Sequence, residues 1–233
     1  MSAPARRYAI VVGDGDAPDR TELDGAWPNW DDGVAVVVAA DGGARLAERL
    51  GLAIDAWVGD GDSLDEPAIE RLAVAGVAVR RVSTAKDESD LELGLVEAID
   101  RGATEVTIVG GTGGRLDHTL ANIGLLGHPR LEGRPARLLD ARTRITLLSG
   151  PGPDDEPVTG VFEGEPGDVV SLLPQSEVVD GVTTDGLEYP LGDEPLRAGP
   201  ARGLSNVRVA PIARVTIRKG RLLVVETPAT LPP

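Results

Sequence analysis

Carboxylates follow two predicted strands in the first quarter of the chain. Asp41 comes after the apolar run 34–39, and Asp60 and Asp62 come after the shorter run 56–58. Buried parallel strands are apolar throughout, and their carboxyl ends meet at one edge of the sheet, so these carboxylates should gather there. Carboxylates this close would repel one another unless a hard cation neutralised them. The pattern therefore predicts a site for Mg²⁺, which would bridge the phosphates of a substrate.

Two further carboxylates open a predicted helix over residues 87–101. Asp87 and Asp90 stand three residues apart at the start of an apolar-periodic segment that Gly102 ends. Side chains three residues apart share one helix face, so both carboxylates are predicted to lie on the same side of the helix. From the start of this helix, Asp87 and Asp90 would add two carboxylates to the predicted Mg²⁺ site.

A glycine-rich stretch follows the β-branched run 106–109. Gly110, Gly111, Gly113 and Gly114 stand between this predicted strand and a second helical pattern. A turn of this kind exposes backbone N–H groups at the positive end of a helix dipole, which is where phosphate binds. The stretch lacks the lysine of a Walker A loop and the third glycine of the dinucleotide fingerprint, so conventional P-loop and NAD sites are excluded.

Polar residues begin the second helix. Arg115 offers a planar guanidinium that can grip a phosphate, while Asp117 either caps the helix or orients a base or hydroxyl. His118 has neither ligand spacing nor a cysteine partner, so a metal role is disfavoured. It either lines the pocket or packs within the helix, and we prefer the interpretation as a packed helix histidine. The three tryptophans, which all precede residue 60, are interpreted as core or loop anchors.

Strand and helix patterns alternate through the first part of the chain. Apolar runs predict strands at 8–12, 34–39, 56–58, 77–82 and 106–109, with helices between them. Runs without strict alternation are buried on both faces, which is typical of a parallel sheet. We therefore predict an α/β fold with an N-terminal doubly wound, mostly parallel, Rossmann-like sheet.

The pattern changes after residue 140. From residue 144 onward, short apolar segments alternate with Gly, Pro and Asp turns, and the apolar residues do not recur with the spacing of a helix. This predicts a smaller C-terminal all-β sandwich, with the domains at 1–140 and 141–233. Lys219 and Gly220, between two of the apolar segments, are predicted to form a hairpin turn.

Composition limits the partners of the protein. A formal net charge of −15 argues against nucleic acid and anionic membranes. The chain has no cysteine and its first apolar run is too short for a signal peptide, so we expect a cytoplasmic protein. Lys86 and Lys219 are the only lysines. An acidic, lysine-poor surface is favoured in a high-salt cytosol, although a high-GC genome would give the same composition.

Several blocks together resemble the thiamin pyrophosphokinase (thiamin diphosphokinase) family. In chain order they are ADGGA (40–44), GDGDS (59–63), KDESDLE (86–92) and GGRLDH (113–118) with Asn122. Residues 186–191 and 203–206 look like the C-terminal β-domain of that family. The resemblance implies Mg²⁺-dependent transfer of a pyrophosphoryl group from ATP to thiamin, giving thiamin diphosphate and AMP. It also implies a homodimer, with thiamin bound between the α/β domain of one subunit and the β-domain of the other.

The resemblance also implies roles for individual residues. The metal ligands would be Asp60, Asp62 and Asp90. The catalytic groups around the phosphates and the nucleotide would be Asp41, Asp87, Arg115 and Asp117. The residues that bind ATP would be Gly110, Gly111, Gly113, Gly114, Lys86 and Asn122. The residues facing thiamin would be Ser205 and Asn206, with Tyr189 in place of a tryptophan that relatives hold against the thiamin ring.

Other functions remain open at this point. A related pyrophosphokinase acting on another alcohol, such as a hydroxymethylpterin, would share the ATP and Mg²⁺ groups, although the β-domain blocks weigh against it. A non-catalytic thiamin or nucleotide sensor would not need Asp60 and Asp62, so their presence favours catalysis. A metal-dependent phosphohydrolase is disfavoured because the chain has no clustered histidine ligands.

Overall fold

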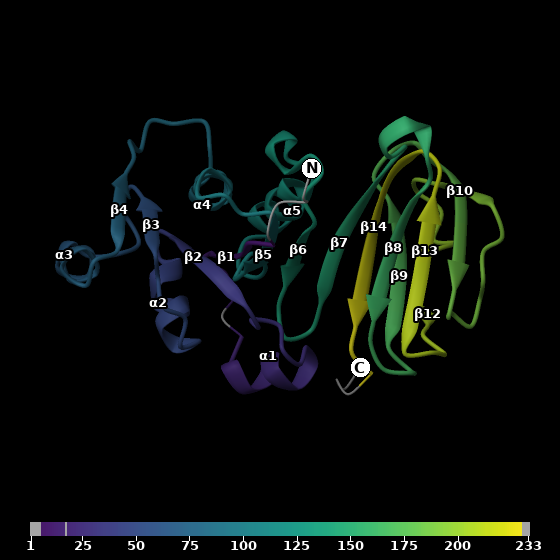
Figure 1. Cartoon of the computed structure of the whole chain (residues 1–233), viewed down its shortest axis with the longest axis horizontal. Helices are drawn as coiled ribbons and strands as arrows, with labels where there is room; N and C mark the ends of the chain where they lie inside the picture. Colours follow the sequence, from purple (N-terminus) through teal and green to yellow (C-terminus); the bar gives the residue numbers. More distant parts are fainter. Residues whose placement is uncertain (1–5, 17, 230–233) are drawn as a thin grey trace. The chain divides into compact units, whose positions relative to one another are not determined.

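The computed structural model describes residues 6–16 and 18–229, and the chain forms two compact units that divide after Ala141. In Figure 1 the first unit runs from purple to teal and the second from green to yellow. Among the residues described, no helix is both long and apolar enough to cross a membrane.

Parallel strands form the sheet of the first unit, in the order β6-β5-β1-β2-β3-β4. The strands are β1 (Tyr8–Val12), β2 (Val34–Ala40), β3 (Ala56–Gly59), β4 (Ala78–Arg81), β5 (Glu105–Val109) and β6 (Ala136–Leu139). Every residue of β1 and β3 is buried, as expected for strands covered on both faces. The strand order reverses at β1, between β5 and β2, and the crevice at such a point is where open α/β sheets bind ligands.

Helices cover both faces of this sheet (Figure 1). They are α1 (Arg20–Ala26), α2 (Gly43–Arg49), α3 (Glu66–Val74), α4 (Asp90–Asp100) and α5 (Leu116–Gly124), followed by the 3₁₀ turns η1 (Leu125–Gly127) and η2 (Pro129–Leu131). Leu23 of α1 and Leu46 of α2 pack with Ile10 on one face, and Gly94 of α4 lies against Val11 on the other. The predicted doubly wound, mostly parallel sheet is confirmed.

Local signals explain the start of α1. The Asp19 side chain caps the helix, and the Glu22 side chain accepts a hydrogen bond from the Asp19 N–H at 3.1 Å, which completes a capping box. The helix and the turn after it bury Trp27 and Trp30, and Trp57 of β3 is fully buried. The interpretation of the tryptophans as core or loop anchors is therefore confirmed.

The start of α4 corrects the prediction for Asp87. The helix begins at Asp90 with Ser89 as its N-cap, and the Glu92 N–H donates to Ser89 Oγ at 3.1 Å. Ser-x-x-Glu is a signature of a helix start, and here it outweighs the apolar periodicity that extended the predicted helix to residue 87. Asp87 is exposed before the helix and does not share a helix face with Asp90.

The second unit is an all-β sandwich, as predicted. Its antiparallel sheets have the orders β12-β9-β14-β7 and β11-β10-β13-β8. The strands are β7 (Arg144–Gly150), β8 (Val158–Glu163), β9 (Val169–Pro174), β10 (Val178–Asp185), β11 (Glu194–Arg197), β12 (Asn206–Val207), β13 (Ile212–Ile217) and β14 (Gly220–Thr227), with a 3₁₀ turn η3 (Pro153–Asp155). Alternate residues of β13, namely Ala213, Val215 and Ile217, pack into the core between the sheets.

The predicted hairpin at Lys219 and Gly220 is wrong. Strand β13 pairs with β10 and β8, whereas β14 pairs with β7 and β9, so the turn carries the chain from one sheet to the other. The Asp180 N–H donates to the Lys219 carbonyl at 2.9 Å, which anchors the turn to β10. Neighbouring apolar segments do not reveal which sheet each strand joins, and this is why the pattern misled.

Buried charges form a network inside the sandwich. Arg208 is 1% exposed, and it donates from Nη2 to Glu226 Oε1 and from Nη1 to the Phe162 carbonyl, both at 2.6 Å. Glu226 also accepts from Arg144 Nε at 2.6 Å, and Asp168 Oδ2 lies 3.6 Å from Arg208 Nε. Buried charges are unfavourable unless they are paired and hydrogen-bonded, so the core depends on every partner in this network.

Candidate active site

A pocket of about 540 Å³ opens at the carboxyl ends of β1, β2, β3 and β5. This is the edge at which parallel sheets bind ligands. The predicted site residues that line it are Asp41, Asp60, Asp62, Lys86, Asp90, Gly110, Gly111, Gly113, Gly114, Arg115 and Asn122. The other two residues predicted for this unit, Asp87 and Asp117, do not line the pocket.

Asp41 directly follows β2 in an unusual backbone conformation. Its φ is 42°, in the left-handed region that residues other than glycine rarely adopt. Trp57 Nε1 donates to the Asp41 carbonyl at 2.9 Å, and the Ser63 N–H donates to Asp41 Oδ2 at 3.0 Å. The residue is 4% exposed, and among the described residues its Oδ1 has no hydrogen-bond partner. A buried, unpartnered carboxylate oxygen held in this way is a candidate ligand atom.

Asp41, Asp60 and Asp62 form a carboxylate triad. One oxygen from each residue lies within 4.8 Å of the others. Burial raises the pKa of Asp41, whereas the neighbouring side chains of Asp41 and Ser63 lower the pKa of Asp62, so Asp62 holds its charge more readily than Asp41. Together with the unpartnered Oδ1 of Asp41, these converging oxygens fit a hard divalent cation such as Mg²⁺.

Asp90 stands next to the triad and is joined to it through Lys86. Lys86 Nζ lies 2.7 Å from Asp90 Oδ1 and 3.3 Å from Asp60 Oδ2. Burial lowers the pKa of Lys86, but the hydrogen bonds with Asp90 and Asp60 outweigh it and leave this pKa above its ordinary value. The structure thus groups Asp41 with Asp60 and Asp62, and it gives Asp90 a lysine partner.

Two glycine-rich loops meet backbone to backbone at the pocket. They are the loop after β1 (13–16) and the loop after β5 (110–113), and we call them the paired loops. The Gly15 N–H donates to the Gly110 carbonyl at 2.8 Å. A Cβ on Gly15 would stand 2.2 Å from the Thr112 carbonyl oxygen, so this close approach requires glycine.

Sequence reasoning missed the loop after β1. Its Asp14 and Asp16 both line the pocket. Asp14 Oδ2 lies 3.5 Å from Arg45 Nη2, and Arg45 Nη1 donates to the Ser63 carbonyl at 2.6 Å, which ties this loop to the loop of the triad. A signal was present, because the residues after β1 repeat the Gly-Asp-Gly-Asp order of residues 59–62, which stand at the end of β3.

We expect Gly15→Ala to lower the free energy of unfolding by about 1–3 kcal/mol, because the added methyl group would force the paired loops apart. Urea denaturation followed by circular dichroism measures this change. Gly25→Ala is the matched control: Gly25 lies within α1, and a Cβ there meets nothing within 4 Å. That variant should be as stable as the wild type or slightly more stable. Wild-type stability of Gly15→Ala would contradict the glycine requirement.

The start of α5 adds exposed polar groups to the pocket. Arg115 is the N-cap residue, and its Nε and Nη2 lie 3.1 and 2.5 Å from the carboxylate oxygens of Asp117, which does not cap the helix. His118 is exposed and lines the pocket, so its interpretation as a packed histidine was wrong. Helix α5 buries none of its residues, which explains the error. Asn122 Nδ2 donates to the Gly111 carbonyl at 2.8 Å and ties the helix to the glycine loop.

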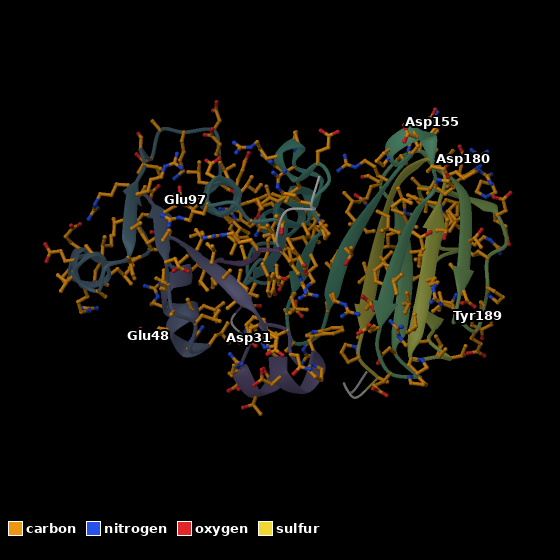
Figure 2. The ribbon with its side chains drawn as sticks, viewed as in Figure 1. Asp31, Glu48, Glu97, Asp155, Asp180 and Tyr189 are labelled. Atoms are coloured by element: carbon orange, nitrogen blue, oxygen red, sulfur yellow. The ribbon has the colours of Figure 1, made fainter. Side chains whose placement is uncertain are left out.

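The residues predicted to face thiamin lie together in the second unit. Asn206 Oδ1 accepts from the Tyr189 N–H at 3.0 Å, and its Nδ2 donates to the Tyr189 carbonyl at 2.7 Å. The buried Asn206 side chain therefore fixes the backbone at Tyr189. Tyr189 is 63% exposed on the outside of this unit (Figure 2), and Ser205 is exposed with a φ of 57°. Tyr189 and Ser205 are thus the exposed residues of this cluster, and Asn206 is its buried support.

The chain is similar to known proteins along most of its length. Residues 29–137 match the family described as thiamin pyrophosphokinase, catalytic domain, and residues 161–222 match thiamin pyrophosphokinase, vitamin B1 binding domain. The chain is 30% identical over 169 residues to the thiamine pyrophosphokinase of Bacillus subtilis (strain 168), an alignment that spans 72% of this chain and 76% of that protein.

Solved structures agree with this similarity. A thiamine pyrophosphokinase from Bacillus subtilis superposes with a TM-score of 0.79 at 26% identity, over 95% of this chain and 99% of that one. A thiamin pyrophosphokinase from Geobacillus thermodenitrificans gives a TM-score of 0.76 at 26% identity, over 96% and 98%. A yeast thiamin pyrophosphokinase, at 16% identity, a TM-score of 0.73 and coverage of 97% and 87%, shares the fold.

Proposed function

Because this chain belongs to the thiamin pyrophosphokinase family, we propose that it transfers the pyrophosphoryl group of ATP to the hydroxyethyl oxygen of thiamin, giving thiamin diphosphate and AMP. The observation that carries the proposal is the carboxylate triad beside the paired loops, within one pocket. The triad suits a divalent cation and the glycine-rich loops suit a polyphosphate, which is the combination that phosphoryl chemistry needs.

The residues of the pocket fit the phosphoryl-transfer part of this reaction. Phosphoryl-type transfer depends on in-line positioning and on positive charge at the non-bridging oxygens more than on covalent help. Asp60 and Asp62 would hold Mg²⁺, which when bound supplies part of that charge. Asp41, whose oxygen converges with theirs, and Asp90, which the family resemblance implies, would complete the set of ligands. Lys86 adds an ammonium and Arg115 a guanidinium that Asp117 orients. We assign the hydroxyl proton of thiamin to a pocket carboxylate that does not bind the cation.

We further propose a division of labour between the units. Residues 1–140 would bind ATP and Mg²⁺, and residues 141–233 would bind thiamin through Tyr189 and Ser205. The family descriptions support this division, since the catalytic description covers 29–137 and the vitamin B1 binding description covers 161–222. We propose that the protein acts as a homodimer in which each thiamin is shared between subunits.

The cellular setting is also a proposal. We place the protein in the cytoplasm, in agreement with the absence of cysteine from the sequence. A net charge of −15 and only two lysines support a cytosol of high salt concentration. In that setting both the melting temperature and the activity should rise with molar KCl.

We expect purified protein to release AMP from ATP only when thiamin and Mg²⁺ are present, with thiamin diphosphate formed in equal amount. EDTA should abolish the reaction and added Mg²⁺ should restore it, because the cation neutralises the phosphate oxygens. Nucleotide products are measured by chromatography at low and at molar KCl. Thiamin-dependent ADP would mean single-phosphoryl transfer and would contradict the proposal. A folded protein that forms no nucleotide product at any salt concentration would favour another acceptor or a sensor.

A further inference from the structure

Lys86 is unusual in a chain that otherwise uses arginine. Of the 23 basic residues only Lys86 and Lys219 are lysines. Lysine carries a compact charge on a flexible stem, whereas the planar fork of arginine holds a carboxylate in a fixed two-point contact. An ammonium between two carboxylates can therefore release one of them while it keeps the other.

The two contacts of Lys86 are unequal. Its Nζ is closer to Asp90, at 2.7 Å, than to Asp60, at 3.3 Å. Asp60 also belongs to the carboxylate triad, and its side chain is only 10% exposed. A divalent cation at the triad would compete with Lys86 for Asp60, which is the longer of its two contacts.

The pocket has an excess of negative charge, and Lys86 is placed to offset it. Acidic side chains outnumber basic ones in the described lining, where the basic residues are Lys86 and Arg115. Arg115 is exposed and bonded to Asp117, whereas Lys86 contacts a member of the triad. Lys86 is therefore the basic side chain that offsets the triad directly.

We propose that Lys86 is the resident counter-cation of the triad in the metal-free enzyme, and that it releases Asp60 when a divalent cation binds. The inference rests on the proposed function, because it takes the triad as the cation site. Lys86 is thus a positioning residue: it holds the carboxylates together before the cation arrives and then remains at the pocket that receives the polyphosphate.

Removal of the ammonium should have two opposite effects. The metal-free protein should lose stability, because the carboxylates then repel each other without compensation. The cation should bind more tightly, because it no longer displaces a positive charge from Asp60. A lysine that only anchored its loop would instead lower stability with and without the cation, and its removal would not improve cation binding.

Lys86→Met tests the proposal, with Lys219→Met as the matched control that removes the same charge from an exposed residue of the second unit. Binding of Mg²⁺ and Mn²⁺ is measured by calorimetry without nucleotide, and melting temperatures are measured without cation and at saturating Mg²⁺. We expect Lys86→Met to bind either cation at least about tenfold more tightly than the wild type. It should melt below the wild type without cation, and saturating Mg²⁺ should close that gap. Lys219→Met should match the wild type throughout.

Several results would overturn the inference. These are unchanged or weaker cation binding by Lys86→Met, and a melting gap that persists at saturating Mg²⁺. Lys86→Arg retains the charge, so tighter binding by that variant would also contradict it. A wild type that binds no divalent cation would overturn both the triad as a cation site and this inference. If the wild type binds the cation and forms AMP, and Lys86→Met binds the cation with the same affinity as the wild type, this inference fails while the proposed function stands.

Discussion

Asp60→Asn is expected to lower the rate of thiamin pyrophosphorylation at least about a thousandfold, because the amide removes one charged ligand from the triad. The fold should survive, since an asparagine Oδ1 can still accept the hydrogen bond that the Asp62 N–H gives to Asp60 at 3.1 Å. Loss of one carboxylate also relieves repulsion among the acidic side chains that remain. The measurements are kcat/KM from AMP formation and a melting curve by circular dichroism.

Asp32→Asn is the matched control for this experiment. Asp32 is an exposed aspartate of the same unit, outside the pocket lining, so the variant should keep wild-type activity. Activity within about tenfold of the wild type for Asp60→Asn would remove Asp60 from the metal site, since a lost metal ligand should have a far larger effect. An unfolded Asp60→Asn protein would show that Asp60 is needed for the pocket to form.

Glu226→Gln should be the most destabilising conservative change in the sandwich. Glu226 is 1% exposed and accepts hydrogen bonds from Arg208 and Arg144. The substitution leaves the buried guanidinium of Arg208 without its closest negative partner, and breaking a buried ion pair in this way costs about 3–5 kcal/mol. Urea denaturation followed by far-ultraviolet circular dichroism measures the loss. Tryptophan fluorescence would not report on this unit, because all three tryptophans precede residue 60.

Glu194→Gln separates this effect from the loss of any glutamate–arginine pair. Glu194 pairs with Arg202 at the surface of the same unit, and both side chains are more than a third exposed. Exposed ion pairs contribute about 0–1 kcal/mol, so this variant should unfold almost as the wild type does. Equal stability of the Glu226→Gln and Glu194→Gln proteins would mean that the buried network relaxes or admits water.

Much of the candidate site could be predicted because strand ends are visible in the sequence. A buried strand followed by a carboxylate determines both where a side chain lies and which edge of the sheet it faces, and this placed Asp41, Asp60 and Asp62 in one pocket. The glycine loop after β5 was found for the same reason. These predictions depend on periodicity and turn chemistry, which act over a few neighbouring residues.

The remainder depended on contacts between distant segments. The grouping of Asp41 with Asp60 and Asp62, and the pairing of Asp90 with Lys86, are set by how three loops approach one another, which no local pattern specifies. The loop after β1 looked like an ordinary turn because its partner lies far along the chain. Arg208 likewise gave no sign of burial, since a single arginine within a short apolar segment is usually solvated.

The paired loops also bear on how the enzyme acquires its activity during folding. They bring Gly15 against Gly110, so the pocket is complete only when β5 lies beside β1, which is a non-local contact of the chain. An intermediate with β1, β2 and β3 in place would carry the whole carboxylate triad and yet have no phosphate cradle. A nucleotide that binds this pocket would therefore report on the completed sheet centre, and by mass action it would stabilise β5 beside β1.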